Sequence, residues 1–132
     1  MKLKNETLSK NFLIYGFGKS GISSLKYLKK KNRCFIFDDD KKQIKNKYKK
    51  FFISKSKLLN NNFDYIVISP GININRCQLS NYLKKNQKKV ITDFDIFYKF
   101  NPEVLTITIT GTNGKSTTSK LLYDILKKHH YD

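Results

Sequence analysis

Eight consecutive residues near the end of the chain, Thr110 to Thr117, combine residue types that bind a nucleoside triphosphate. Their order is Thr-Gly-Thr-Asn-Gly-Lys-Ser-Thr. An alternating apolar segment, 104–109, precedes them and predicts a strand, while apolar residues at helical spacing follow them. A glycine loop between a strand and a helix offers phosphate both backbone N–H groups and the positive end of the helix. The pattern therefore predicts a phosphate-binding loop.

Within this loop, we expect the Lys115 ammonium to reach the β- and γ-phosphates of ATP and the Ser116 hydroxyl to bind Mg²⁺. The predicted ATP-binding residues are Gly111, Thr112, Asn113, Gly114, Lys115, Ser116 and Thr117. The standard P-loop has a further glycine six residues before the lysine, where this chain has Ile109. The sequence leaves one alternative open, a glycine-rich turn in which a serine or threonine caps the next helix.

A second glycine motif, Gly-Phe-Gly-Lys-Ser-Gly at Gly16 to Gly21, lies near the start of the chain. An apolar strand is predicted before it, over 11–15, and a helix with apolar positions 22, 25 and 28 after it. The next predicted strand, 33–37, ends in the acids Asp38 and Asp39. Acids about 20 positions after the glycines are typical of dinucleotide-binding units.

The rest of the chain continues the alternation of strands and helices. The sequence predicts strands over 51–53, 63–68 and 89–92, and helices over 75–86 and 93–98, with Asp93 capping the last. Segment 41–50 fits either helix or loop. We therefore predict an α/β fold with a Rossmann-like parallel sheet in 1–93, a linker in 94–102, and the first strand, P-loop and helix of an ATP-binding domain in 103–132. Because one strand and one helix cannot complete a parallel sheet, we expect that domain to be truncated and the chain to be the N-terminal piece of a longer protein.

Composition narrows the class of partner. The net charge is +17, but only two of the 27 basic residues are arginine, the residue that base recognition favours. The enriched Lys, Asn, Ile, Phe and Tyr are encoded by A/T-rich codons, which favours compositional drift over a nucleic-acid surface; a functional polyanion surface stays open as the alternative. We expect no nucleic-acid partner, no membrane span or signal peptide, a cytoplasmic location and a monomer.

In chain order, the segments GFGKSG, FDD, ISPGI, TDFDIF and TGTNGKST resemble the Mur ligases of peptidoglycan synthesis. The last segment is shared with folylpolyglutamate synthases, whereas the first three resemble more narrowly the D-glutamate-adding members. The resemblance implies a three-domain ligase that uses ATP and Mg²⁺ to activate UDP-N-acetylmuramoyl-L-alanine as an acyl phosphate, which D-glutamate then attacks. It also implies that Lys115 is catalytic, because it stabilises charge on the phosphoryl group in transfer.

The same resemblance implies a UDP-sugar site in the first domain. Lys19 and Ser20 stand where the glycine loop meets the diphosphate, Asp38 and Asp39 where the uracil is read, and Ser69 beside the sugar-nucleotide cleft. The implied UDP-substrate-binding residues are Gly16, Phe17, Gly18, Lys19, Ser20, Gly21, Asp38, Asp39, Ser69, Pro70 and Gly71. The plainer alternatives are a solvated strand end for the acids and a tight turn for residues 69–71.

Two residues depart from the family pattern, since Thr92 replaces a glycine and Asp95 replaces a glutamate. These departures predict a local linker geometry that differs from that of the family. Three other functions remain open: an NAD(P)-binding Rossmann module, another Mur ligase or folylpolyglutamate-synthase-like ligase, and a degenerate fragment that only binds nucleotide. We expect this chain by itself to be inactive, because the domain that selects the amino acid has no counterpart in it.

Overall fold

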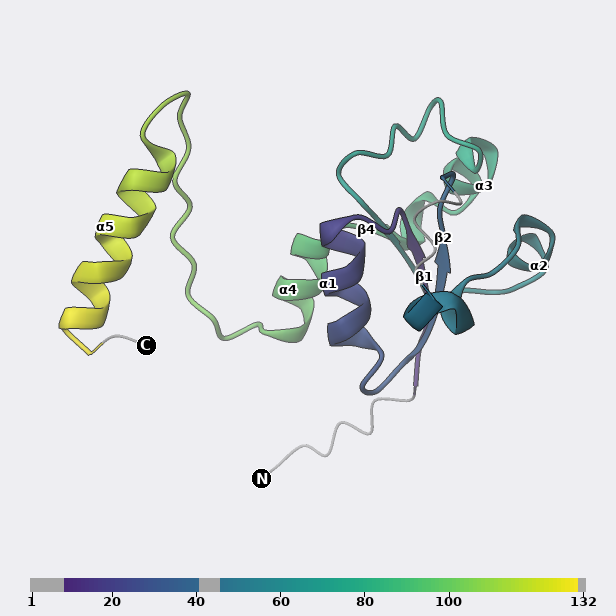
Figure 1. Ribbon diagram of the computed structural model, residues 1–132, viewed down its shortest axis with the longest axis horizontal. Coiled ribbons are helices and arrows are strands. Elements are labelled where there is room, and N and C mark those ends of the chain that lie inside the picture. The colour runs from purple at the N-terminus through teal and green to yellow at the C-terminus, as the bar shows by residue number, and fades with distance from the viewer. Residues whose placement is uncertain (1–8, 41–45, 131–132) are drawn as a thin grey trace. The chain divides into compact units, whose positions relative to one another are not determined.

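The computed structural model describes residues 9–40 and 46–130, and the chain divides after Pro102 into two compact units (Figure 1). The first unit is built on a four-stranded parallel sheet with the order β2-β1-β3-β4. Its strands are β1 Asn11–Tyr15, β2 Arg33–Phe37, β3 Tyr65–Ile68 and β4 Val90–Ile91. This arrangement confirms the predicted α/β fold with a Rossmann-like parallel sheet.

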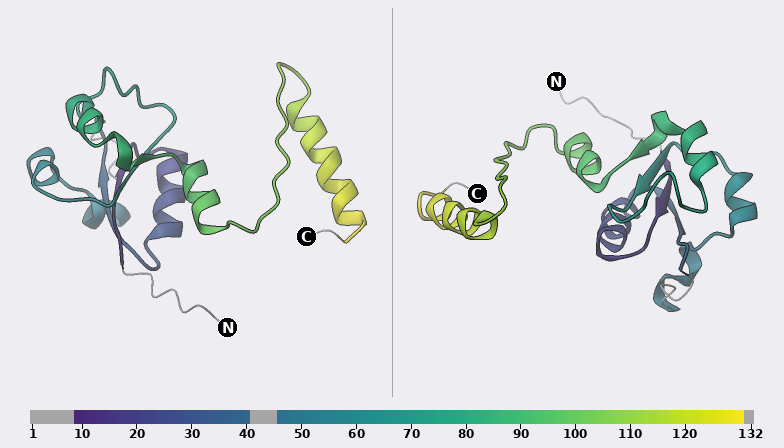
Figure 2. Two further views of the ribbon diagram at one scale, coloured as in Figure 1. Left: turned by 180° about the vertical axis from the view of Figure 1, so that it is seen from behind. Right: turned by 90° about the horizontal axis from the view of Figure 1, so that it is seen from above.

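Helices cover both faces of this sheet (Figures 1 and 2). The α-helices of the first unit are α1 Lys19–Leu28, α2 Lys55–Leu59, α3 Ser80–Lys85 and α4 Asp93–Phe100, and the 3₁₀ helices are η2 Asn46–Phe51 and η3 Gln87–Lys89. Helices α1 and α4 pack on one face, and α2 and α3 on the other. Helix α4, which falls in the range predicted as a linker, thus packs within the first unit.

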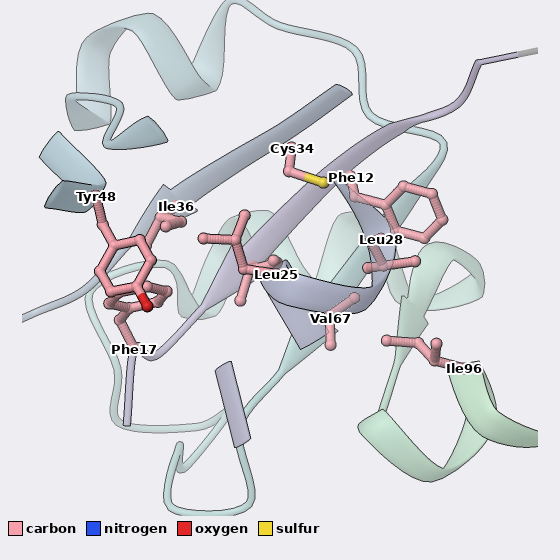
Figure 3. Packing of buried hydrophobic residues seen from close by; sticks show 10 residues of the cluster. Phe12, Phe17, Leu25, Leu28, Cys34, Ile36, Tyr48, Val67 and Ile96 are labelled. Carbon is pink, nitrogen blue, oxygen red and sulfur yellow. The ribbon is translucent and has the colours of Figure 1, made fainter. Parts of the chain in front are cut away.

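Alternation along β1 divides the core between the two faces. Phe12 and Ile14 belong to the cluster under α1 and α4. Figure 3 shows Phe12 of this cluster together with Leu25 and Ile96. Leu13 and Tyr15 point into the cluster on the opposite face. All four of these β1 side chains are fully buried. A strand with no exposed face is what a central parallel strand requires, since helices cover both of its sides.

Several element boundaries differ from the predictions. The helix predicted over 75–86 begins only at Ser80, because residues 73–77 form turns in which the Asn73 side chain accepts the Asn75 backbone N–H at 3.0 Å. An asparagine side chain that bonds to nearby backbone competes with the helix. In place of a strand over 51–53, Phe52 makes one isolated parallel bridge to Ile36. Part of the segment 41–50, residues 41–45, lies outside the described residues.

The second unit contains one helix, α5 Lys115–Lys128. Residues 104–109, predicted as a strand, form no strand in the structure. A β-strand is defined by its pairing, and among residues 103–130 this segment has no neighbouring strand to pair with. No residue in this range is buried, and Leu105 is 97% exposed.

Candidate functional site

Four predicted segments meet at the carboxyl edge of the sheet. The chain leaves β1 and runs to β2 on one side, whereas β3 pairs with β1 on the other side, so the strand order reverses at β1. Open α/β sheets bind ligands outside the carboxyl ends of the strands at such a switch point. The glycine loop 16–21 follows β1, the acids 38–39 follow β2, the turn 69–71 follows β3, and Asp93 follows β4.

Two glycines of the first loop are required by packing. Gly16 has φ +89°, and a Cβ there would lie 2.8 Å from the Ser69 Cβ. A Cβ on Gly21 would clash with the Gly16 carbonyl oxygen, because the two atoms would lie far closer than the sum of their van der Waals radii. Gly16 also donates its backbone N–H to the Phe37 carbonyl at 2.9 Å, which ties the loop to the end of β2. The loop is therefore tightly folded against its neighbours before any ligand binds.

The remaining part of the loop is open. Gly18 is exposed, has nothing within 4 Å of the place where a Cβ would lie, and is the N-cap of α1 without any side-chain capping bond. Within the described residues, the backbone N–H groups of Lys19, Ser20 and Gly21 have no hydrogen-bond acceptor. The first turn of α1 therefore offers unpaired donors and its positive end to an anion.

Phe17 contributes to the loop through its backbone. The residue is 1% exposed, and its ring packs edge-to-face against Tyr48 with centroids 5.0 Å apart (Figure 3). It packs in the same way against Phe52, with centroids 5.5 Å apart. The Phe17 N–H donates to Asp38 Oδ2 at 2.6 Å. The aromatic side chain therefore anchors the loop in the core, and the backbone N–H ties it to the end of β2.

The acids after β2 have defined partners. Besides its bond from Phe17, Asp38 accepts the Asp40 N–H through Oδ1 at 2.8 Å. The Tyr15 hydroxyl lies 2.8 Å from both Asp39 oxygens and donates to that carboxylate. Burial, followed by the Cys77 and Asp39 side chains, raises the pKa of Tyr15, so the hydroxyl remains protonated as a donor. Asp38 thus orders the glycine loop, which a merely solvated strand end would not do.

The turn after β3 closes the edge of the site. Ser69 donates its hydroxyl to the Gly16 carbonyl at 2.9 Å, and its backbone N–H bonds to the Tyr15 carbonyl at 2.9 Å. Pro70 and Gly71 are exposed, and no atom lies within 4 Å of a Cβ built on Gly71. Ser69 therefore fixes the distance between the two loops, while the next two residues border open space.

Sequence reasoning placed the cap of α4 at Asp93, and the structure corrects this to Thr92. The Thr92 hydroxyl accepts the Asp95 N–H at 3.3 Å, and the Asp95 carboxylate accepts the Thr92 N–H at 2.7 Å. These bonds lower the pKa of Asp95, with the bond from the Thr92 backbone as the largest cause. The Thr-x-x-Asp spacing was the signal that could have identified this capping box. Asp93, released from capping, accepts the Ser20 hydroxyl proton at 2.6 Å.

The second glycine loop has a different construction. Gly114, with φ +79°, is the N-cap of α5 and is accompanied by no side-chain capping bond, so neither serine nor threonine caps this helix. The Lys115 ammonium donates to the carbonyls of Gly111 and Thr112. Residues 111–117 are all exposed. The lysine is thus folded back over its own loop, and both of these hydrogen-bond partners belong to that loop.

Comparison with known protein families shows which family the chain belongs to. The sequence model described as "Mur ligase MurD-like, N-terminal domain" matches residues 10–92, which hold the sheet and the first three site segments. The chain belongs to the Mur ligase MurD-like family. The match ends at Thr92, so it does not extend to the second glycine loop.

Curated relatives agree with the family. The chain is similar to the UDP-N-acetylmuramoylalanine–D-glutamate ligases of Caldicellulosiruptor saccharolyticus, Rickettsia bellii and Aquifex aeolicus, with identities of 34%, 33% and 35%. These matches cover 93%, 92% and 89% of this chain but only 29%, 28% and 26% of the relatives. The chain therefore spans less than a third of the length of these ligases.

Two other features of the chain, a surface cavity and a buried cysteine, give weaker support for a binding or catalytic site. A cavity of about 770 Å³ lies beside the amino end of β2 and is lined by Lys29, Lys30, Arg33, Lys47 and Lys50 among others, with no residue of the glycine loop in its lining. A lysine-rich lining is expected in a chain with this charge.

Burial raises the pKa of Cys34 to about 11, which leaves an unreactive thiol. The described part of the chain contains neither a cluster of three metal-ligating side chains of the His, Cys, Asp or Glu type nor a helix long and apolar enough to cross a membrane.

Proposed function

We propose that the chain is the N-terminal part of an ATP-dependent ligase that adds D-glutamate to UDP-N-acetylmuramoyl-L-alanine, and that its first unit binds the UDP group. The observation that carries the proposal is the meeting of the glycine loop, the β2 acids and the β3 turn at the strand switch point. The family and the names of the relatives support the choice of substrate.

The diphosphate would bind at the open end of the glycine loop. The unpaired N–H groups in the first turn of α1 would donate to its oxygens, and the exposed Lys19 ammonium would add a charge. Gly18 has the free space that a phosphate needs to approach the backbone closely. Gly71 offers similar space on the neighbouring turn, where the sugar would leave the diphosphate.

The uracil end would lie near the acids after β2. Each Asp38 oxygen accepts one backbone N–H, and a carboxylate oxygen has a second lone pair available for the uracil N–H. Asp39 is exposed, and its contact with the Tyr15 hydroxyl fixes its orientation. This recognition distinguishes the proposal from a nicotinamide-binding module, in which an acid at the same place would accept a ribose hydroxyl.

The second loop would act on ATP. In the proposed reaction, the terminal phosphoryl group moves to the substrate carboxylate, giving an acyl phosphate and ADP, and the D-glutamate amino group then displaces phosphate to form the amide. Lys115 would stabilise charge on the transferring group. The Ser116 hydroxyl is exposed in the first turn of α5 and has the hard oxygen that Mg²⁺ prefers; the ion would neutralise phosphate charge.

Two substitutions test the two sites separately, in a protein expressed from the whole reading frame that contains these residues. Lys115→Ala should reduce turnover by more than about a hundredfold and leave the affinity for the UDP substrate intact. Asp38→Ala should lower the affinity for the UDP substrate about tenfold and leave the affinity for ATP unchanged. Lys120→Ala, which changes an exposed lysine five residues further along α5, is the matched control.

Turnover of Lys115→Ala within tenfold of wild type would contradict the ATP assignment. An unchanged affinity of Asp38→Ala for the UDP substrate would contradict the UDP assignment. Calorimetry on the 132-residue chain separates the competing module, because the proposal expects tighter binding of UDP than of NAD. The reverse order would favour the nicotinamide module.

A further inference from the structure

Ser20 and Asp93 form a hydrogen bond between two helix beginnings. Ser20 is the second residue of α1, and Asp93 is the first residue of α4. The Ser20 Oγ donates to Asp93 Oδ2 at 2.6 Å, and both side chains are half-buried. The other carboxylate oxygen, Oδ1, accepts the Phe94 N–H at 3.1 Å. The Asp93 carboxylate is therefore fixed through both of its oxygens.

Packing keeps this pair together. Asp93 follows β4 at the carboxyl edge of the sheet, and α4 then lies beside α1 (Figures 1 and 2). Ile96 of α4 shares a buried cluster with Leu25 and Leu28 of α1 (Figure 3). At the far end of α4, the Phe100 ring contacts Tyr27 of α1, with centroids 6.2 Å apart. The hydrogen bond thus lies at one end of an interface that is packed along its length.

The number of available protons limits what Ser20 can do. A serine hydroxyl has one proton to donate, and here that proton faces Asp93. An O–H···O⁻ bond of this length is charge-assisted and stronger than a neutral one. The carboxylate also lies at the N-terminal turns of two helices, where negative charge is favoured. A phosphate oxygen would have to break this bond to accept the Ser20 proton.

We propose that Asp93 is a positioning residue of the diphosphate loop, which it orders by holding the Ser20 hydroxyl. The inference rests on the proposed UDP function and makes it more specific. Phosphate is then bound by the backbone N–H groups of the first turn of α1 and by Lys19, while the Ser20 side chain joins α1 to α4. Asp93 acts through Ser20 and the loop, without touching the ligand.

The competing role for Ser20, direct donation to phosphate, predicts the opposite behaviour of Asp93. If phosphate takes the serine proton, Asp93 is a competitor for it, and removing the carboxylate should leave UDP affinity unchanged or improve it. If Asp93 orders the loop, removing the carboxylate should lower the affinity for UDP. The effect of Asp93→Ala on UDP affinity therefore separates the two roles by its sign.

A double-mutant cycle on the 132-residue chain tests the inference, with UDP and uridine titrated by calorimetry or NMR. Asp93→Ala and Ser20→Ala should each lower the affinity for UDP about fivefold. The double variant should also lose only about fivefold in affinity, because both changes remove the same hydrogen bond. Uridine, which has no phosphate, should bind every variant within twofold of wild type. Ser20→Thr, which keeps the hydroxyl, should restore UDP binding, and Asp124→Ala on α5 is the control for a lost acidic charge.

Each outcome decides a different point. A wild-type chain that does not bind UDP overturns the proposed function and this inference with it. UDP binding by wild type, combined with independent losses that multiply to about 25-fold in the double variant, overturns the inference alone. An equal loss for uridine and UDP in Asp93→Ala assigns the pair to general folding and also overturns it.

Discussion

The molecule contains two glycine loops, each at the start of a helix, and they differ in what holds them in place. The loop at Gly16 is fixed by residues from the ends of three other strands, through Phe37, Asp38, Ser69 and Asp93. Within the described residues, the hydrogen bonds of the loop at Gly111 are local, made within that loop or to the helix that follows it. The sequence motif thus determines which backbone and side-chain groups are available to a ligand, whereas contacts with neighbouring elements determine how rigidly those groups are held.

Hydrogen exchange should give the largest contrast between the two regions. In this chain, amides at Leu13 and Ile14 are buried in the central strand and should exchange only through global unfolding of the first unit. Amides of α5 such as Leu122 should exchange at least about a thousandfold faster, because a 14-residue helix with no buried residue is marginal in water. Mass spectrometry or NMR measures both. Equal protection would mean that packing does not separate the two units.

Replacing one conformationally required glycine in each loop by alanine should give the next largest difference, measured as a loss of stability. Gly21→Ala should destabilise the first unit by about 3 kcal/mol, because its Cβ meets the Gly16 carbonyl and backbone must move. Gly114→Ala should cost roughly 1–2 kcal/mol locally, for its positive φ, and leave the urea transition of the first unit unchanged.

Gly18→Ala provides the matched control within the first loop. Its φ is −75° and its Cβ would enter open space, so the free energy of unfolding measured in urea should fall by less than about 1 kcal/mol, the cost of alanine at an N-cap. A destabilisation by Gly18→Ala as large as that by Gly21→Ala would contradict the view that packing, rather than glycine content, fixes this loop.

The capping box should give the smallest effect, with a defined pH dependence. Thr92→Ala should lower the stability of the first unit by about 1 kcal/mol. Since the folded-state pKa of Asp95 is lowered, its contribution is complete above its unfolded pKa of about 4 and is lost as pH falls through the folded value. Asp95→Ala should therefore destabilise at pH 7 and converge with wild type in strong acid.

Urea unfolding at several pH values measures this effect. Thr118→Ala on α5 is the control, because it should leave the transition of the first unit unchanged. A destabilisation by Asp95→Ala that persists undiminished at pH 2 would contradict the assignment of this stability to the carboxylate.

The sequence predicted the centre of the fold well, for an identifiable physical reason. Strands such as 11–15 and 33–37 are apolar runs bounded by turn residues, so local pattern and tertiary environment agree. The pattern over 104–109 is just as strand-like, yet this segment forms no strand, because pairing depends on a neighbour that a local pattern cannot supply. Periodicity also did not show that Asn73 would delay the start of α3.

The candidate site was predictable in outline but not in its contacts. Glycine spacing and the acids after β2 predicted that these segments lie together at one edge of the sheet, and they do, because parallel strands bring their carboxyl ends together. The bonds from Phe17 to Asp38 and from Ser20 to Asp93 join residues 21 and 73 positions apart, and single-residue patterns contain no information about such pairs. The roles of the individual residues towards ligand stay predictions.

The pairing of Phe17 with Asp38 limits where the chain can change length. β1 and β2 pair in register from Asn11 opposite Arg33 to Tyr15 opposite Phe37. Because Asp38 directly follows β2, its carboxylate reaches the Phe17 N–H only if the number of residues in β2 does not change. A residue inserted in the surface turn 29–32 would be absorbed before the strand begins. A residue inserted between Arg33 and Asp38 would shift the acid and turn alternate side chains to the wrong face. Insertions in natural or engineered versions of this segment should therefore fall in the turn and spare the strand.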